Sequence, residues 1–275
     1  MQSLWLVPLA AVVLLSGCDH ERTRIVAPRD LTPPAAPRGL FSVTGDGEVE
    51  LQWYANTESD VVGYRVYKGP CADGESCPYD LVGATTGRSY VVSGLTNGTT
   101  RYYAVAAYDR AGNESDLTYE DIFDTPRPEG FGRALTNATD APATAGYDFS
   151  AFTVRPWDDT RSDIYFSVAG GALRMAAPFT DTDLQDAGYA ASLDAVDYAP
   201  SAGWSPTGTV ELIVGHCYVA RIESAGVYNF AKFRVTSLSG VRVVFDWAYQ
   251  TDPNNGELMV APSREEGPRV RRAAI

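Results

Sequence analysis

Alternation of apolar and polar residues at every second position is the main pattern along this chain. Val49, Leu51 and Trp53 follow it in one segment, and Phe233 and Val235 follow it in another. A period of two places these side chains on one face of a β-strand and the intervening residues on the other. No segment keeps a helical period, and turns that contain Gly and Pro separate the segments. The pattern predicts an all-β protein.

The first β-rich region, 37–126, is predicted to hold seven short strands. They are expected at 40–43, 49–53, 62–68, 81–85, 89–92, 102–109 and 115–125. Seven short strands in a region of about 90 residues are typical of an immunoglobulin-like sandwich. The region is therefore expected to fold as one antiparallel sandwich domain.

Individual residues of this region resemble the fibronectin type III domain. The matching features are the Pro-rich entry at Pro37, Trp53 on the second strand, and the segments 63–67, 95–99 and 105–115. Together they cover nearly all of the region. The resemblance implies a spacer or a binding module, because such domains rarely carry catalytic residues.

One position departs from the pattern of that family. The family usually places a corner tyrosine two residues after the position of Thr99, where this chain has Arg101. Tyr102 or Tyr103 can replace it, or the corner is held in another way. The departure puts one local hydrogen bond in doubt and leaves the predicted fold unchanged.

A second antiparallel β domain is predicted at 146–262. It follows a connector at 127–145 that contains few large apolar residues. Its strands are expected at 147–154, 163–168, 172–176, 210–214, 217–223, 231–236 and 241–249. In the sixth of these, Phe233 and Val235 are predicted to face the core, with Lys232 on the outward face. Parts of the connector can pair with this domain.

The stretch at 178–209 in the second domain is too long for a hairpin loop, and loops of this length are often functional. This stretch carries several tyrosines and aspartates together with a tryptophan. A mixture of aromatic rings and carboxylates can bind a carbohydrate or a cation. Two alternatives stay open: a solvated excursion whose rings pack on the sandwich, which we favour, and a glycosidase pair, whose carboxylates need a separation of about 5–9.5 Å. The candidate ligand-binding residues are Tyr189, Tyr198, Trp204, Asp181 and Asp183.

The C-terminal strands carry a second, thinner resemblance. The segments 215–219, 228–235 and 244–250 resemble the C-terminal half of HmuY-type surface lipoproteins. That family includes members that bind haem through paired histidines. This domain has one histidine, His216, so haem ligation does not carry over. We expect His216 to be a hydrogen-bonded core or edge residue.

The four cysteines divide by position. Cys71 and Cys77 close a short loop, and a disulfide between them is expected in an oxidising compartment. A zinc site is not supported there, because zinc requires four ligands and no further Cys or His lies near in sequence. Cys217 is predicted to face a core as a small apolar residue. We predict no metal site, no cofactor and no catalytic constellation.

The N-terminal apolar run, Leu4 to Leu15, ends in Leu15-Ser16-Gly17-Cys18. The run is shorter than the ~20 residues of a membrane span and matches the ~7–15 residues of a signal-peptide core. The last four residues resemble the lipobox of bacterial lipoproteins. The resemblance implies a signal peptide at 1–17 and lipidation of Cys18 by palmitate or similar acyl chains. A Pro-rich tether, 18–36, would follow.

Charge limits the partners. The chain has 275 residues, with 22 Lys and Arg against 35 Asp and Glu, which gives a net charge of −13. This balance does not support nucleic-acid binding, which needs a basic patch. A basic tail at 263–275 is expected to be disordered.

These observations predict a lipid-anchored protein of the bacterial cell envelope, on its extracytoplasmic face. Its role would be non-catalytic binding or adhesion to a surface glycan or a protein, with the first domain as a spacer or interaction module. Two alternatives stay open, namely a surface lipoprotein that scavenges a small haem-like ligand and an envelope glycan hydrolase. The oligomeric state and the identity of the ligand are not predicted.

Overall fold

The computed structural model describes residues 29–71, 77–120 and 122–259. The predicted signal peptide, Cys18 and most of the tether lie outside these residues, as does the basic tail. Contacts between residues group the described residues from Thr32 onward into one unit. Two β-rich parts follow each other within it, here called the sandwich and the second β region. Among the described residues, no helix has the length and apolar character required to cross a membrane.

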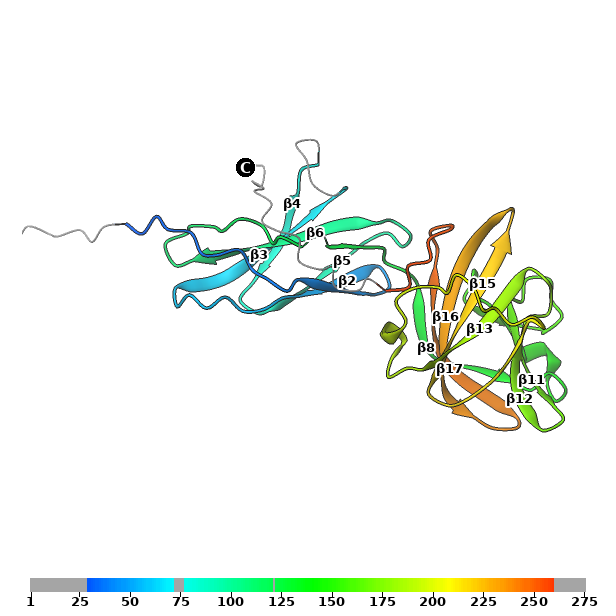
Figure 1. Cartoon of the computed structure of the whole chain (residues 1–275). Coiled ribbons are helices and arrows are strands. Elements are labelled where there is room, and N and C mark those ends of the chain that lie inside the picture. Colours follow the sequence, from blue (N-terminus) through cyan, green and yellow to red (C-terminus); the bar gives the residue numbers. More distant parts are fainter. Residues whose placement is uncertain (1–28, 72–76, 121, 260–275) are drawn as a thin grey trace, which may run out of the picture. The chain divides into compact units, whose positions relative to one another are not determined.

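The sandwich consists of two antiparallel sheets with the strand orders β1-β2-β5 and β4-β3-β6-β7 (Figure 1). All seven strands predicted for this region are present, although the last is shorter than expected. Their bounds are β1 Phe41–Thr44, β2 Glu48–Gln52, β3 Val61–Gly69, β4 Asp80–Thr85, β5 Ser89–Ser93, β6 Arg101–Asp109 and β7 Ile122–Asp124.

Alternation along the strands builds the core of the sandwich. Val49 and Leu51 of β2 are fully buried, as the sequence predicts. Trp53 meets Tyr64 of β3 edge to face, with 5.3 Å between the ring centroids, a favoured geometry for aromatic pairs. Tyr103 is also buried, but its hydroxyl has no hydrogen-bond partner among the described residues. Tyr103 therefore does not supply the missing corner bond.

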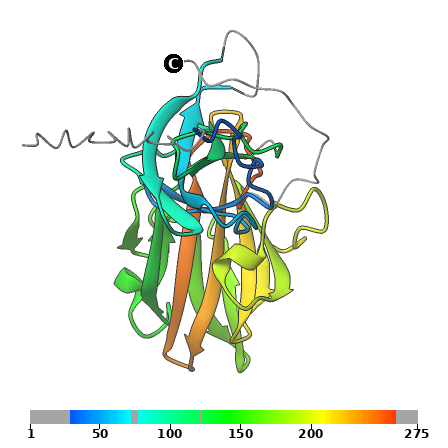
Figure 2. The same cartoon turned by 90° about the vertical axis from the view of Figure 1, so that its left-hand side faces the viewer.

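The second β region has two five-stranded antiparallel sheets, with the orders β10-β9-β11-β12-β14 and β13-β15-β16-β17-β8. In Figure 2, the long strands β16 and β17, coloured yellow to orange, run side by side. The strands are β8 Glu129–Thr136, β9 Gly146–Asp148, β10 Thr153–Arg155, β11 Ile164–Ala169, β12 Ala172–Ala176, β13 Thr182–Tyr189, β14 Thr209–Glu211, β15 His216–Ser224, β16 Val227–Leu238 and β17 Arg242–Gln250. Two 3₁₀ turns complete the elements, η1 Pro142–Thr144 and η2 Leu193–Ala195.

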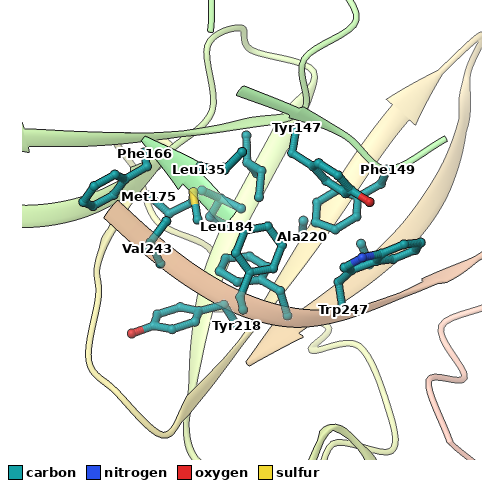
Figure 3. Close-up of a cluster of buried hydrophobic side chains, with 14 of the residues drawn as sticks. Leu135, Tyr147, Phe149, Phe166, Met175, Leu184, Tyr218, Ala220, Val243 and Trp247 are labelled. Atoms are coloured by element: carbon teal, nitrogen blue, oxygen red, sulfur yellow. The ribbon is translucent and has the colours of Figure 1, made fainter. Parts of the chain in front are cut away.

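Aromatic side chains fill the space between these two sheets. Tyr147 from the shorter-stranded sheet packs against Phe245 and Trp247 of β17, with centroids 5.8 and 5.7 Å apart. Figure 3 shows Tyr147, Phe149 and Trp247 converging in this core. Phe233 is fully buried here, as predicted.

Three elements differ from the sequence-based expectation. The predicted strand at 147–154 is instead a tight hairpin of β9 and β10, with Phe152 in the left-handed region at φ 55°. The connector, parts of which were expected to pair with this domain, does so and forms a full strand, β8, paired with β17. The predicted loop at 178–209 begins with a strand, β13, paired with β15. Strands β8 and β13 are edge strands with few apolar residues, so their alternation is weak.

The structure agrees with the predicted disulfide and with the predicted burial of Cys217. Cys71 and Cys77 form a disulfide, and Cys217 is a buried free thiol. Its side chain packs with Ala190, Leu193 and Val196, which cover the outer face of β15. Cys217 is therefore buried by the chain that crosses this face and lies outside the core between the sheets.

Candidate ligand-binding site

A β-bulge at the end of β13 builds the candidate site. The pairing of β13 with β15 shifts between Asp186 and Gly188, after which Tyr189 lies opposite His216. Gly188 adopts φ +86°, a conformation that glycine takes without strain, and its N–H donates to Oδ1 of Asp186 at 2.8 Å. Bulges redirect side chains at strand ends. This one places Asp186 and Tyr189 beside the start of β15.

Tyr189 is an exposed ring that rests on a glycine. Its side chain is 77% exposed. A Cβ atom placed on Gly215 would lie 2.9 Å from Cε2 of the Tyr189 ring, so the ring lies against the backbone of Gly215. Gly215 has φ +87°, which other residues rarely adopt. The ring therefore packs against Gly215, and most of its surface is open to solvent.

His216 and Asp186 form a polar pair next to this ring. Nδ1 of His216 donates to the Asp186 carboxylate, at 3.1 Å from Oδ1 and 3.0 Å from Oδ2. A carboxylate on Nδ1 fixes the tautomer and orientation of the imidazole, which leaves Nε2 for another partner. The prediction that His216 is a hydrogen-bonded residue is confirmed.

The loop between β14 and β15 adds apolar surface. Ile213 and Val214 are 47% and 53% exposed. The hydroxyl of Tyr218 holds this loop, because it accepts a hydrogen bond from the N–H of Ile213 at 2.8 Å and donates to the carbonyl of Glu211 at 2.9 Å. The exposed residues are thus presented on a fixed backbone.

Asp183 and Trp204 belong to a separate cluster on the outer face of the sheet. The guanidinium of Arg221 lies between two rings, 4.8 Å from the Trp204 centroid and 4.9 Å from that of Tyr228. It also donates to Oδ2 of Asp183 from Nε at 3.0 Å and from Nη2 at 2.6 Å. Trp204 thereby fastens the segment after β13 onto the sheet, as the packing alternative predicts.

The remaining two candidates lie elsewhere. Asp181 directly precedes β13 and Tyr189 ends it, which places them roughly 25 Å apart at about 3.3 Å per residue. Tyr198 is 54% exposed and pairs in an isolated bridge with Glu257. Burial and the Glu257 carboxylate raise the pKa of Tyr198. The structure brings Asp183 and Trp204 together at Arg221 and places Asp181 and Tyr189 at opposite ends of β13.

Sequence reasoning missed the roles of Gly215, Asp186 and the loop residues Ile213 and Val214 at this site. Their grouping depends on β13, which the sequence did not predict, and on the bulge that sets its register. One signal was available: Gly215 directly precedes His216, and a glycine at a strand entry often marks a close approach.

Two buried titratable groups, a thiol and an amine, lie near the site. Burial raises the pKa of the Cys217 thiol to about 11, which removes the thiolate that nucleophilic attack requires. Lys232 is fully buried on the outer face of β16. Its Nζ donates to the carbonyls of Leu193 and Val196, at 2.6 and 2.9 Å, and so holds the η2 turn over the sheet.

Comparison with known proteins gives partial matches. No family model matches the chain. It is 31% identical over 136 residues to an amylopullulanase from Thermoanaerobacterium saccharolyticum, which is 49% of this chain and 10% of that protein. It is 33% identical over 133 residues to exoglucanase B from Cellulomonas fimi, or 47% of this chain and 10% of that protein.

Two further matches complete the comparison. Chitinase A1 from Niallia circulans is 35% identical over 124 residues, which is 44% of this chain and 16% of that protein. Among solved structures, an Fn3-like protein from Clostridium thermocellum is 28% identical, covers 32% of this chain and 88% of that chain, and has a TM-score of 0.28. The chain thus spans between a tenth and a sixth of the length of these three curated relatives.

Proposed function

We propose that this chain is a non-catalytic glycan-binding protein whose ligand platform is the Tyr189 ring. The observation that carries the proposal is the exposed ring seated on Gly215, beside the pair of His216 and Asp186. The three curated relatives that match part of the chain support a glycan as the ligand, since their names are those of enzymes that act on glucans and chitin.

The chemistry of the platform suits a sugar. One face of a pyranose ring carries C–H groups, and these are attracted to the electron-rich face of an aromatic ring. A tyrosine loses little conformational entropy on binding because it has only two side-chain torsions. Nε2 of His216 and the Asp186 carboxylate can bond the sugar hydroxyls. Ile213 and Val214 would extend the contact with apolar surface.

The sandwich would act as a spacer between this platform and the cell surface. We propose that the protein is extracytoplasmic and is held at a membrane by acyl chains on Cys18. The support is the lipobox resemblance, which lies outside the described residues. Metabolic labelling with a palmitate analogue tests it: label on the wild type and none on Cys18→Ser is expected, and equal label on both contradicts the anchor.

Binding is tested by calorimetric titration of the protein with maltohexaose, cellohexaose and chitohexaose. We expect at least one of these to bind and Tyr189→Ala to weaken that binding. An aromatic contact contributes about 0.5–1.5 kcal/mol beyond its area, so the loss in affinity should reach roughly ten-fold. Tyr189→Phe keeps the ring and should retain binding. Tyr198→Ala removes another exposed tyrosine and serves as the matched control.

Unchanged affinity in Tyr189→Ala would show that the ring is not the platform. The two alternatives from the sequence, haem-like scavenging and glycan hydrolysis, stay predictions with their own tests. A haem absorption shift that His216→Ala abolishes would favour the first. Release of reducing sugar that depends on Asp181 or Asp194 would favour the second.

A further inference from the structure

A second exposed tyrosine, Tyr54 in the sandwich, packs against a glycine with a positive φ, as Tyr189 does. Tyr54 follows β2 and is 70% exposed. A Cβ atom placed on Gly39 would lie 2.3 Å from Cε2 and 2.4 Å from Cδ2 of the Tyr54 ring. Gly39 has φ +69°, and the N–H of Tyr54 donates to the carbonyl of Arg38 at 2.9 Å. The ring therefore packs against Gly39 while most of its surface stays exposed.

The ring borders a hollow of about 340 Å³, lined by 35–38 and 54–58. A second hollow of about 340 Å³ shares Ala55, Asn56 and Glu58 with the first. Small-molecule sites usually start at about 300 Å³, so each hollow has room for a sugar unit. Because the two share a wall, consecutive units of one linear chain can occupy them.

Polar groups on this wall are fixed in place. The Glu58 carboxylate accepts from the N–H of Ala35 at 2.8 Å and of Thr57 at 3.0 Å. These backbone bonds lower the pKa of Glu58, so the group is ionised at neutral pH. Nδ2 of Asn56 donates to the carbonyl of Ala35 at 2.8 Å. The carboxylate is thus held in position before any ligand arrives.

The geometry points to a second glycan-binding site in the sandwich, which takes a linear oligosaccharide of neutral sugars. One pyranose stacks on Tyr54, and its hydroxyls bond the Glu58 carboxylate and the exposed guanidinium of Arg38, which lines the same hollow. The next unit crosses the wall into the neighbouring hollow. The ligand class rests on the proposed function, whereas the site itself is independent of Tyr189.

The test is calorimetric titration of the full chain with maltohexaose, cellohexaose and chitohexaose, which measures both affinity and stoichiometry. The wild type should bind a hexasaccharide at two sites. Tyr54→Ala should leave one, or weaken the second site roughly ten-fold, and Tyr189→Ala should remove the other. Tyr54→Phe keeps the ring and should bind at two sites. Leu81→Ala removes an exposed apolar side chain on the other sheet and is the matched control.

Two further variants keep the test sharp. Gly39→Ala leaves the tyrosine in the chain but displaces its ring, and should weaken the same site. Glu58→Gln keeps the size of the side chain but loses the charge and one of the two oxygens that accept from Ala35 and Thr57, so it reports on the site if Tyr54→Ala fails to fold. Circular dichroism and the urea midpoint check each fold.

The outcomes separate the two sites. Full stoichiometry in Tyr54→Ala, with one site lost in Tyr189→Ala, overturns the site in the sandwich and leaves the proposed function standing. Binding that depends on Tyr54 and is unchanged in Tyr189→Ala supports the site in the sandwich and overturns the platform at Tyr189. No binding of any of the three saccharides overturns both.

Discussion

The buried Lys232 should make the protein more stable as the pH rises above neutrality. Burial and the nearby Arg127 guanidinium lower the pKa of this lysine from 10.5 to about 7. The carboxylates of Asp194 and Glu129 act in the opposite direction but do not reverse the shift. The folded chain therefore holds a largely neutral amine above pH 7, whereas the unfolded chain holds an ammonium group.

The sign of the pH dependence follows from the protons bound. Between the folded and unfolded pKa values, the unfolded chain binds one more proton at Lys232, so the free energy of unfolding increases with pH. The increase is up to about 1.4 kcal/mol per pH unit. Between about pH 7.5 and about pH 9.5, Lys232 should thus contribute roughly 2–3 kcal/mol.

Urea unfolding at these two pH values, followed by tryptophan fluorescence, measures the effect in the wild type and in Lys232→Met. The variant should lack the increase that Lys232 contributes. Its lost bonds to Leu193 and Val196 shift its stability by a similar amount at both pH values, so the difference remains interpretable. Lys68→Met, at the only other lysine of the chain, should behave like the wild type. An equal pH increase in wild type and Lys232→Met would refute the reasoning.

Three further predictions concern stability. Burial raises the pKa of Asp163 to about 7. Between pH 3.8 and 7 the folded chain therefore binds one more proton at Asp163 than the unfolded chain, and the contribution of Asp163 to the free energy of unfolding falls as the pH rises. Urea unfolding of Asp163→Asn should lack this fall. Tyr218→Phe leaves the N–H of Ile213 without its acceptor, and should lower the free energy of unfolding by about 1–3 kcal/mol, with equal urea midpoints as the contrary result. Replacing Cys71 and Cys77 by serine should cost about 2 kcal/mol on the loop-entropy estimate, and an unchanged thermal midpoint would contradict it.

The sequence predicted the elements in which alternation is strong. Strand β2 carries Val49 and Leu51 on its inner face, and β16 carries Phe233 and Val235, so the buried face is visible in the residue order. Strand β13 was missed because its inward residues include a threonine, Thr182, which gives little hydrophobic signal. Edge strands need only one paired neighbour, and their outward residues are free to be polar.

The candidate site was predicted only in part. Tyr189 was predicted as a candidate because the stretch around it mixes aromatic residues with aspartates. Its neighbour His216, however, lies 27 positions further along the chain. That pairing depends on a bulge, and a shift of one residue would move every side chain to the other face. The burial of Lys232 was also unforeseen, since alternation indicates that it faces outward and does not reveal what covers that face.

Because Cys217 is buried, its reaction with an alkylating reagent can report transient opening of the segment that covers β15. Cys71 and Cys77 are joined, and the thiol of Cys217 lies beneath Ala190 and Leu193. In a protein with Cys18 replaced by serine, an alkylating reagent can therefore react only when the segment over β15 lifts away. The rate of alkylation then depends on how often this segment opens. Repeating the measurement with an oligosaccharide would show whether a ligand bound at Tyr189, one residue before Ala190, slows the opening.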